Sequence, residues 1–347
     1  MNRKRLCCVL ALLLCAIMLF GCVAAQSAAA PSEPAQNEAP PSAAEQSAPI
    51  ESAEPAQAES LPEEAPETAE ASGSWVYVTG SASDYDVNIE GFLNESFGIT
   101  AGRTGETHYT TDGGKTWPRS ENMSMCRFSI DIVDENLVWN GGNGSQIRVS
   151  KDGGKTYSAV TDLPLGGSVS NLDFIDEITG WACTTGKCAS TADGGMTWTP
   201  MTLPEEAKGI AALSLRTPAD GYIFSRNGLF LTTHDGGATW DVKDVGMADY
   251  KVVDEKNEPG LYKFSAAVAD IAFTDEQNGT LVFTGIVPGE GTLVWCLKTQ
   301  DGGAQWTAEQ VAVPQDFKTS RLYLSADGKY LTLGSFSKDM ILFKAAQ

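Results

Sequence analysis

Three aspartates on predicted inner strands, Asp131, Asp173 and Asp270, are the residues of this sequence best placed for acid–base chemistry. Two carboxyl groups that face each other across a cleft can hydrolyse a glycosidic bond, and their separation sets the stereochemistry. The alternative is that all three are solvated or hydrogen-bonded residues near strand ends. The sequence favours this structural interpretation, so we assign no catalytic residue and keep the three as weak candidates.

The composition argues against several other kinds of site. The 347 residues include 45 acidic and 24 basic side chains, which gives a formal net charge of −21. Nucleic acid is therefore not expected as a partner, because phosphate binding needs a surface rich in lysine and arginine. The only two histidines, His108 and His234, cannot form a three-histidine zinc centre. We expect no metal and no cofactor.

Cysteines offer a different chemistry. Cys183 and Cys188 flank the turn Thr184–Lys187, so a disulfide between them is sterically plausible in an exported protein. Cys126 and Cys296 are compatible with buried, small apolar side chains. The sequence leaves the state of these last two open.

The N-terminus has the features of an export signal. A basic stretch, Asn2–Arg5, precedes an apolar run, Leu6–Phe20, which is shorter than the ~20 residues of a membrane-spanning helix. The run ends in Gly21-Cys22, which resembles the bacterial lipobox. The resemblance implies that residues 1–21 are a signal peptide and that Cys22 is acylated, with palmitate among the chains. Such a lipid would anchor the protein to the outer surface of the cell membrane. An uncleaved signal anchor is the alternative.

Residues 22–74 consist almost entirely of Ala, Glu, Pro, Ser and Gln. A segment of this composition cannot bury enough apolar surface to offset the entropy lost on ordering, so we expect a disordered tether. Its negative charge and scattered prolines favour an extended chain. The tether would hold the folded part away from the membrane, or would be a solvated tail with no role beyond spacing.

Five stretches of the remaining chain share one pattern, a Ser or Thr, any residue, Asp-Gly-Gly, two further residues and an aromatic residue. Their aspartates are Asp112, Asp152, Asp193, Asp235 and Asp301. Asp-Gly-Gly is typical of a hairpin turn, because glycine adopts positive φ and the carboxylate accepts hydrogen bonds from nearby N–H groups. We therefore interpret the five aspartates as structural turn residues, not as catalytic or calcium-binding ones.

The spacing of these aspartates predicts the fold. Successive ones lie 40, 41, 42 and 66 residues apart, and periods near 40 with several short strands per unit are typical of a β-propeller. Residues 75–347 are predicted to form six antiparallel, four-stranded blades, or seven if the longest interval contains another. Residues Trp75–Val78 lie one period before the first repeat, so we expect them to be the outer strand of the last blade. Closure of this kind removes exposed sheet edges.

The five turns resemble Asp-box (BNR) repeats. Together with stretches such as Phe174–Trp181, they resemble the propeller family of photosystem II assembly and stability factors. This resemblance implies a non-catalytic assembly platform that binds a membrane-protein partner through a basic patch; here the seven arginines after residue 75 are scattered. Sialidases carry the same boxes, but their Phe-Arg-Ile-Pro motif is absent, as is any arginine between Arg5 and Arg103. We predict a binding platform for a protein or glycan, with a glycoside hydrolase as the alternative.

The 66-residue interval predicts where a partner binds. Its excess length falls in the connection Asp241–Ala267 and in the turn Gly285–Gly291, both of which should project from the face opposite the boxes. Loops on a rigid scaffold often carry binding function, and the longer segment holds amphipathic residues of the kind enriched in interfaces. The candidate contact residues are Tyr250, Lys251, Tyr262, Lys263 and Phe264. A surface excursion without a partner is the alternative.

Overall fold

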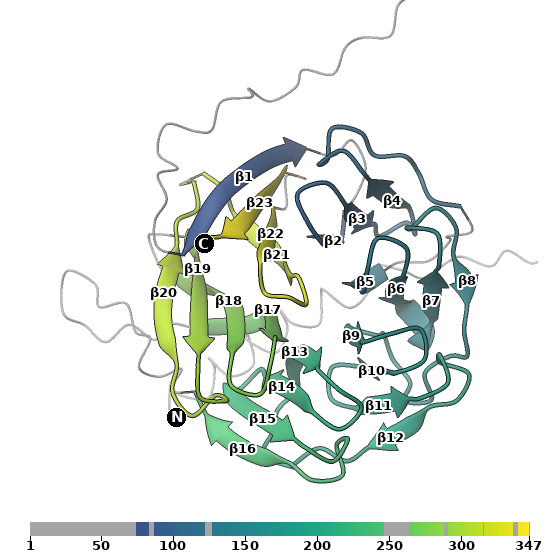
Figure 1. The fold of residues 1–347 in the computed structure, drawn as a ribbon, viewed down its shortest axis with the longest axis vertical. Helices are drawn as coiled ribbons and strands as arrows, with labels where there is room; N and C mark the ends of the chain where they lie inside the picture. The colour runs from purple at the N-terminus through teal and green to yellow at the C-terminus, as the bar shows by residue number, and fades with distance from the viewer. Residues whose placement is uncertain are drawn as a thin grey trace, which may run out of the picture. The chain divides into compact units, whose positions relative to one another are not determined.

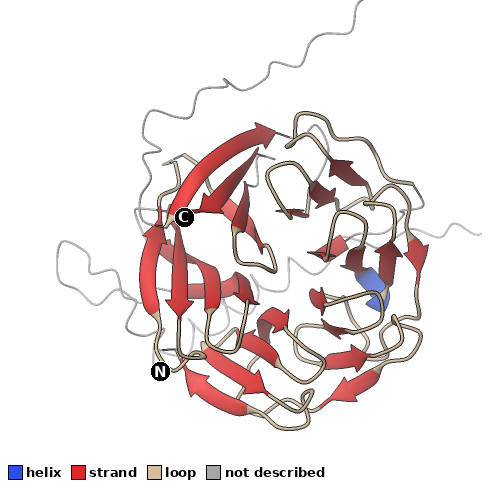
Figure 2. Cartoon of the chain, in the orientation of Figure 1, coloured by secondary structure: helices blue, strands red, loops and turns tan. Residues whose placement is uncertain are grey.

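The computed structural model describes residues 74–82, 87–121, 127–245, 264–287, 291–314, 316–335 and 339–346. The predicted signal peptide, Cys22 and almost all of the tether lie outside these residues, as does Cys126. Strands account for the regular structure of the described chain, apart from one short 3₁₀ turn, Asn143–Ser145 (Figure 2). Within this part of the chain there is no helix long and apolar enough to cross a membrane.

Six antiparallel sheets are arranged as the blades of a ring (Figure 1). Five blades have four strands, and blade 1 has three, with a single bridge between His108 and Arg119 at the fourth position. The strands, from the innermost to the outermost, are as follows: blade 1, β2 (Ile89–Phe92), β3 (Gly98–Ala101) and β4 (Thr107–Thr110); blade 2, β5 (Arg127–Ile132), β6 (Val138–Gly142), β7 (Ile147–Ser150) and β8 (Ser158–Ala159); blade 3, β9 (Asn171–Phe174), β10 (Gly180–Cys183), β11 (Cys188–Thr191) and β12 (Thr199–Met201); blade 4, β13 (Ile210–Leu215), β14 (Gly221–Ser225), β15 (Leu229–Thr233) and β16 (Asp241–Asp244); blade 5, β17 (Phe264–Phe273), β18 (Gly279–Val287), β19 (Gly291–Thr299) and β20 (Thr307–Val311); blade 6, β21 (Thr319–Leu324), β22 (Tyr330–Ser335), β23 (Asp339–Ala345) and β1 (Trp75–Ala82).

The ring closes through its first strand, as predicted. β1 pairs antiparallel with β23, from Trp75 opposite Ala345 to Ala82 opposite Asp339, and so completes blade 6. The main chain of the two ends also meets, because the Ala346 N–H donates to the Ser74 carbonyl at 2.7 Å. The six-bladed propeller closed by an N-terminal strand is thereby confirmed.

The long interval of the sequence does not contain a seventh blade. Strands β17, β18 and β19 of blade 5 are 10, 9 and 9 residues long, whereas the inner strands of the other blades have 4 to 6 residues. Most of the predicted insertion Gly285–Gly291 is therefore strand, since β18 reaches Val287 and β19 begins at Gly291. The longer sheet satisfies its backbone hydrogen bonds by pairing with itself.

Aromatic side chains fill the spaces between neighbouring blades. Trp139 of β6 stacks on Phe174 of β9, with ring centroids 3.7 Å apart, and Tyr222 of β14 stacks in the same way on Phe273 of β17. The box residue Trp198 approaches Phe174 edge-on. Each blade thus buries its face against the next, and each fully buried side chain of this size contributes roughly 1.5–3 kcal/mol.

Candidate functional site

The three candidate aspartates lie on innermost strands, where each is bound to the backbone of the following blade. Asp131 accepts a hydrogen bond from the Phe174 N–H at 2.7 Å, and Asp173 accepts one from the Leu215 N–H at 2.7 Å. Asp270 accepts one from the Leu324 N–H at 2.8 Å. In each case the donor is the last residue of the next innermost strand, so the carboxyl groups connect blades.

Other side chains complete this pattern around the channel. The Phe273 N–H donates to Ser214 Oγ at 3.3 Å, and the Phe92 N–H donates to Thr332 Oγ1 at 3.1 Å. The Ile132 N–H donates to the Tyr323 hydroxyl at 3.3 Å. We call these six bonds the inter-blade ring; its donors are the final residues of all six innermost strands, namely Phe92, Ile132, Phe174, Leu215, Phe273 and Leu324.

Tyr323 reaches blade 2 from blade 6 because blade 1 leaves room for it. Its ring lies over Gly91, where a Cβ atom would come within 2.5 Å of the ring carbons. Glycine is therefore required at this position of β2. The sequence gave no indication of this contact, since nothing in the local pattern links Gly91 to Tyr323.

Burial shifts the pKa values of the ring aspartates upward. It raises the pKa of Asp173 and that of Asp270 to about 7, although the hydrogen bonds from backbone N–H groups oppose the shift. The pKa of Asp131, which is 6% exposed, lies well above its ordinary value, first through burial and then through the negative charge of Asp173. The raised values match those of catalytic acids, but one oxygen of each carboxyl group is committed to a neighbouring blade. This geometry favours the structural interpretation.

The wider end of the channel holds a cavity of about 190 Å³ at the beginnings of the innermost strands. All six blades contribute to its wall, which is largely polar; the lining includes Asn88, Ser129, Ser170, Asn171, Ala211, Asp270, Ser320 and Arg321. Phe128 also lines it and is 38% exposed. Because the inter-blade ring lies at the ends of the same strands, the cavity and the ring occupy opposite ends of the channel. The cavity belongs to the face opposite the boxes.

A buried ion pair forms part of the wall between blades 6 and 1. Arg321 Nε lies 2.7 Å from Glu90 Oε2, and the two side chains are 12% and 2% exposed. Burial raises the pKa of Glu90, and the charge of Arg321 acts against that shift. Removal of one member of such a pair leaves an uncompensated buried charge.

The five box aspartates are used within their own turns. In every box both glycines have positive φ, between 67° and 87°. The aspartate Oδ1 accepts the N–H of the residue four positions later at 2.8–3.0 Å, and the Ser or Thr two positions earlier donates its hydroxyl to the same oxygen. These hydrogen bonds hold the pKa of the box aspartates below its ordinary value, to about 2 at Asp235. The geometry agrees with a structural turn.

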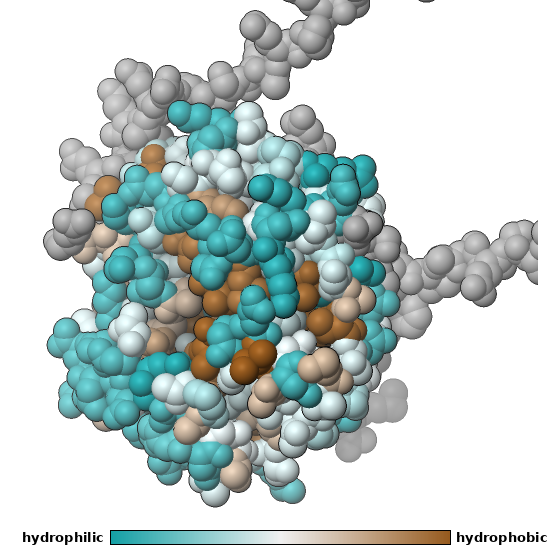
Figure 3. Space-filling model, turned by 45° about the vertical axis from the view of Figure 1, so that its right-hand side comes forward, coloured by the Kyte–Doolittle hydropathy of each residue, from teal (hydrophilic) through white to brown (hydrophobic). Residues whose placement is uncertain are grey.

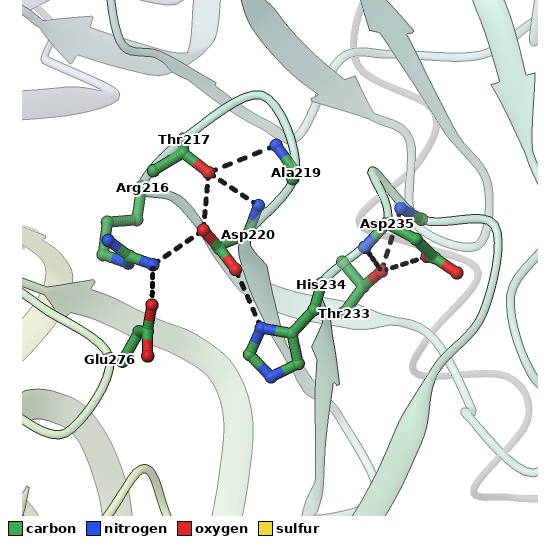
Figure 4. A network of polar contacts seen from close by, with 9 residues as sticks. Arg216, Thr217, Ala219, Asp220, Thr233, His234, Asp235 and Glu276 are labelled. Atoms are coloured by element: carbon green, nitrogen blue, oxygen red, sulfur yellow. Dashed lines mark hydrogen bonds and ion pairs between the residues drawn. The ribbon is translucent and has the colours of Figure 1, made fainter.

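A polar network on the box face joins blades 4 and 5 (Figure 4). Arg216 contacts Asp220 Oδ2 at 2.7 Å and Glu276 Oε1 at 3.2 Å, and His234 Nδ1 lies 2.8 Å from Asp220 Oδ1. Thr217 donates its hydroxyl to Asp220, and this bond is the main cause of the lowered pKa of Asp220. An Asp–His pair can act as a general base, but the nearest hydroxyl is itself bound to the aspartate. The network orders three turns.

The remaining predicted residues divide into described and undescribed ones. Cys183 and Cys188 face each other across β10 and β11 and are joined in a disulfide, with a Cα–Cα distance of 4.1 Å. Cys296 is a buried thiol whose pKa burial raises to about 11. Among the partner candidates, Phe264 begins β17 without a described side chain. Tyr250, Lys251, Tyr262 and Lys263 lie outside the described residues.

The described residues contain no group of three or more His, Cys, Asp or Glu side chains that could hold a metal ion. Tests of the disulfide and of the loop residues therefore rest on experiments with the protein, and the metal and cofactor predictions stay predictions.

Comparison with solved structures finds proteins of the same architecture. The structure of YCF48 bound to D1 peptide matches 80% of this chain and 97% of its own, with a TM-score of 0.50 and 16% sequence identity. YCF48 from Cyanidioschyzon merolae gives 0.49 at 16% identity over 79% and 98% of the two chains. The WD40 β-propeller domain of Doa1 gives 0.49 at 10% identity over 78% and 97%.

Sequence comparisons are silent by contrast. No protein-family model matches the chain, and no curated protein matches it. The likeness to solved structures is thus one of fold, and it places this chain among the β-propellers.

Proposed function

We propose that this protein is an exported lipoprotein whose propeller is a non-catalytic platform for a protein partner, bound on the face opposite the boxes. The observation that carries the proposal is the cavity at that end of the channel, which all six blades line. Concave sites with a few polar groups and an accessible aromatic residue are the usual places for ligands and peptides to bind. Phe128 supplies the aromatic residue.

The path of the chain adds support. The connection between β16 and β17 leaves blade 4 at Asp244 and returns at Phe264, and residues Val268–Asp270 of β17 line the cavity. This connection holds four of the five partner candidates. Its return point therefore lies close to the cavity wall, which is where a recognition loop on a rigid scaffold would act.

The comparison with YCF48 supports a peptide or protein as the partner. That protein has been solved bound to D1 peptide, and it shares the propeller architecture with this chain. A cavity lined by strand residues from six blades suits an extended segment, since backbone and small polar side chains can form hydrogen bonds along it. We infer a protein segment here in preference to a glycan.

Anchoring at Cys22 gives the platform its place. The acidic tether of about 50 residues between Cys22 and Ser74 would span at least roughly 40 Å as a flexible chain. It would join the ring at its rim, where Ser74 is bonded through its N–H to Glu309 Oε2 at 3.1 Å. Lipid and tether together would let the propeller reach partners near the outer membrane surface.

One experiment tests the platform and the anchor separately. The intact protein is captured from its own membranes after cross-linking, beside Phe128→Glu and the double variant Tyr250→Ala/Tyr262→Ala. We expect a recovered protein to be lost from both variants while their melting temperatures stay unchanged. Equal recovery with all three proteins would contradict the proposed site.

The anchor has its own readout. Cys22→Ser should move the protein from the membrane to the soluble fraction without changing its melting temperature. Retention of that variant on washed membranes would contradict lipidation and would leave the partner site unaffected.

A further inference from the structure

Blade 3 differs from the other blades on the box face. Ile178 is 54% exposed and Met196 is 67% exposed. They are the two most exposed large apolar side chains among the described residues; the others are Val76 and Phe128. Single exposed apolar residues are common on protein surfaces, but these two belong to adjacent turns of one blade.

The backbone brings the two turns side by side. The Gly194 N–H of the box donates to the Ile178 carbonyl at 2.9 Å, and Met196 follows two residues later. A Cβ atom built on Gly194 would lie 4.0 Å from the Ile178 Cα. Both apolar side chains therefore arise from one pair of joined turns.

The other four boxes are an internal control. Each makes the same bond from its first glycine to the turn between the two innermost strands, and the accepting residues there are Ser96, Asn136, Ala219 and Gln277. The residues that correspond to Met196 are Lys115, Lys155, Ala238 and Ala304. The turn forms with all of these, so the fold does not require a large apolar residue at either position. The two exposed residues of blade 3 are available for contact with another molecule.

Carboxylates surround the apolar pair. The two turns carry Asp176, Glu177 and Asp193 and no basic residue. Hydrogen bonds, first of all from the Thr197 hydroxyl, keep the pKa of Asp193 below its ordinary value, so that it remains charged at neutral pH. The neighbouring Lys151 of blade 2 is paired with Glu177 at 2.8 Å. Figure 3 shows how apolar side chains gather among hydrophilic ones on the visible surface.

We propose that Asp176, Glu177, Ile178, Asp193 and Met196, here called the blade 3 patch, dock a cationic segment of a second protein. The segment would place an apolar side chain against Ile178 and Met196, with lysines or arginines on either side facing the carboxylates. An anionic membrane would be repelled by the three carboxylates, and so would a second copy of this acidic surface. The patch lies on the face opposite the channel cavity, so the propeller could hold two proteins at once.

Exchange between blades provides variants that the fold tolerates. Met196→Lys introduces the residue of the blade 2 box, and Ile178→Asn introduces the residue of the blade 2 turn. Ala304→Lys adds the same charge to the blade 5 box and is the matched control. The probes are three fluorescent 12-residue peptides with a central Leu-Leu pair, flanked by lysine and arginine, by serine, or by glutamate.

Binding of each peptide to the full chain is followed by fluorescence anisotropy at two salt concentrations. We expect the basic peptide alone to bind, more weakly at high salt, and each blade 3 variant to weaken it at least about tenfold. Ala304→Lys should leave the affinity within about twofold.

Several outcomes would overturn the proposal. These are no detectable binding of the basic peptide, equal binding to all variants, and equal binding of the serine or glutamate peptide. Binding of the chain to phosphatidylglycerol vesicles that Met196→Lys alters in parallel would reassign the patch to lipid. Unchanged melting temperatures would show that the variants are folded.

Discussion

The box turns and the inter-blade ring both use a side-chain oxygen to bind a backbone N–H, yet they do so in opposite settings. The box aspartates are exposed, bind within their own turn and have lowered pKa values. Asp131, Asp173 and Asp270 are enclosed by neighbouring strands, bind the next blade and have raised pKa values. Contacts within a blade repeat in sequence, whereas contacts between blades repeat only in geometry. The predictions below separate the two.

Loss of the closing strand should have the largest effect, because it removes contacts between the two ends of the ring. Deletion of residues 75–79 removes the 2%-exposed Trp75 and half of the pairing with β23. We expect a loss of more than about 4 kcal/mol in the free energy of unfolding, measured by chemical denaturation. An unaltered cooperative transition would contradict closure by β1.

Removal of a buried charge between blades should come next. Glu90→Ala leaves Arg321 buried without its partner, and we expect a loss of about 3 kcal/mol in the free energy of unfolding. The matched control is Glu177→Ala, which breaks the exposed pair with Lys151 and should cost less than about 0.5 kcal/mol. Similar losses in both variants would remove the distinction between the two regions.

The pH dependence of stability should reveal the ring aspartates. Their pKa values are raised in the folded protein, so it binds more protons than the unfolded chain between pH about 4 and about 7. Their contribution is fully present below pH about 4 and is lost as the pH rises through about 7. We expect stability to fall by roughly 1–3 kcal/mol between pH 5 and 8.

The variant Asp173→Asn/Asp270→Asn keeps an oxygen that can accept each N–H and removes both titrations. It should flatten this decrease without loss of stability at pH 8. A wild-type stability that rises from pH 5 to 8, or a double variant with an unchanged slope, would refute the raised values. The exposed box aspartates act in the other direction, because their lowered pKa values place their contribution above pH about 4 and remove it toward pH about 2.

The smallest effect is expected within a single box. Asp152→Ala removes the hydrogen bonds to Thr156 and Ser150, and we expect a loss of about 1 kcal/mol by thermal denaturation. Since these bonds lie within one turn, the transition should stay cooperative. A loss as large as that of Glu90→Ala would mean that the box also holds blades together.

The sequence predicted what repeats along the chain. Because the box lies in a surface turn of nearly constant surroundings, its Asp-Gly-Gly pattern survives in five copies, and its period reveals the number of blades. The position of Trp75, one period before the first box, was sufficient to predict closure. The long interval misled in part, since strands can lengthen without a change in their local pattern, as β17 to β19 do.

The inter-blade ring was not predictable from the same pattern. Three of its oxygens come from Ser214, Thr332 and Tyr323, which share neither residue type nor strand position. Even the aspartates differ, because Asp173 pairs with Trp181 across its blade, whereas Asp270 lies further from the turn and pairs with Val282. Which oxygen reaches which N–H depends on how two blades pack, and no local signal records that. The blade 3 patch was missed because one Met and one Ile look like ordinary turn variation.

The pairing of β1 with β23 also sets the order of events during synthesis. The first strand of the ring to emerge has as its partner the last one, so blade 6 stays incomplete until residues near 345 have been made. Until then β1 and blade 1 present unpaired edges, which in other proteins invite association with neighbouring chains. A chain interrupted in any blade would therefore keep an open edge, and only the completed chain could hide both.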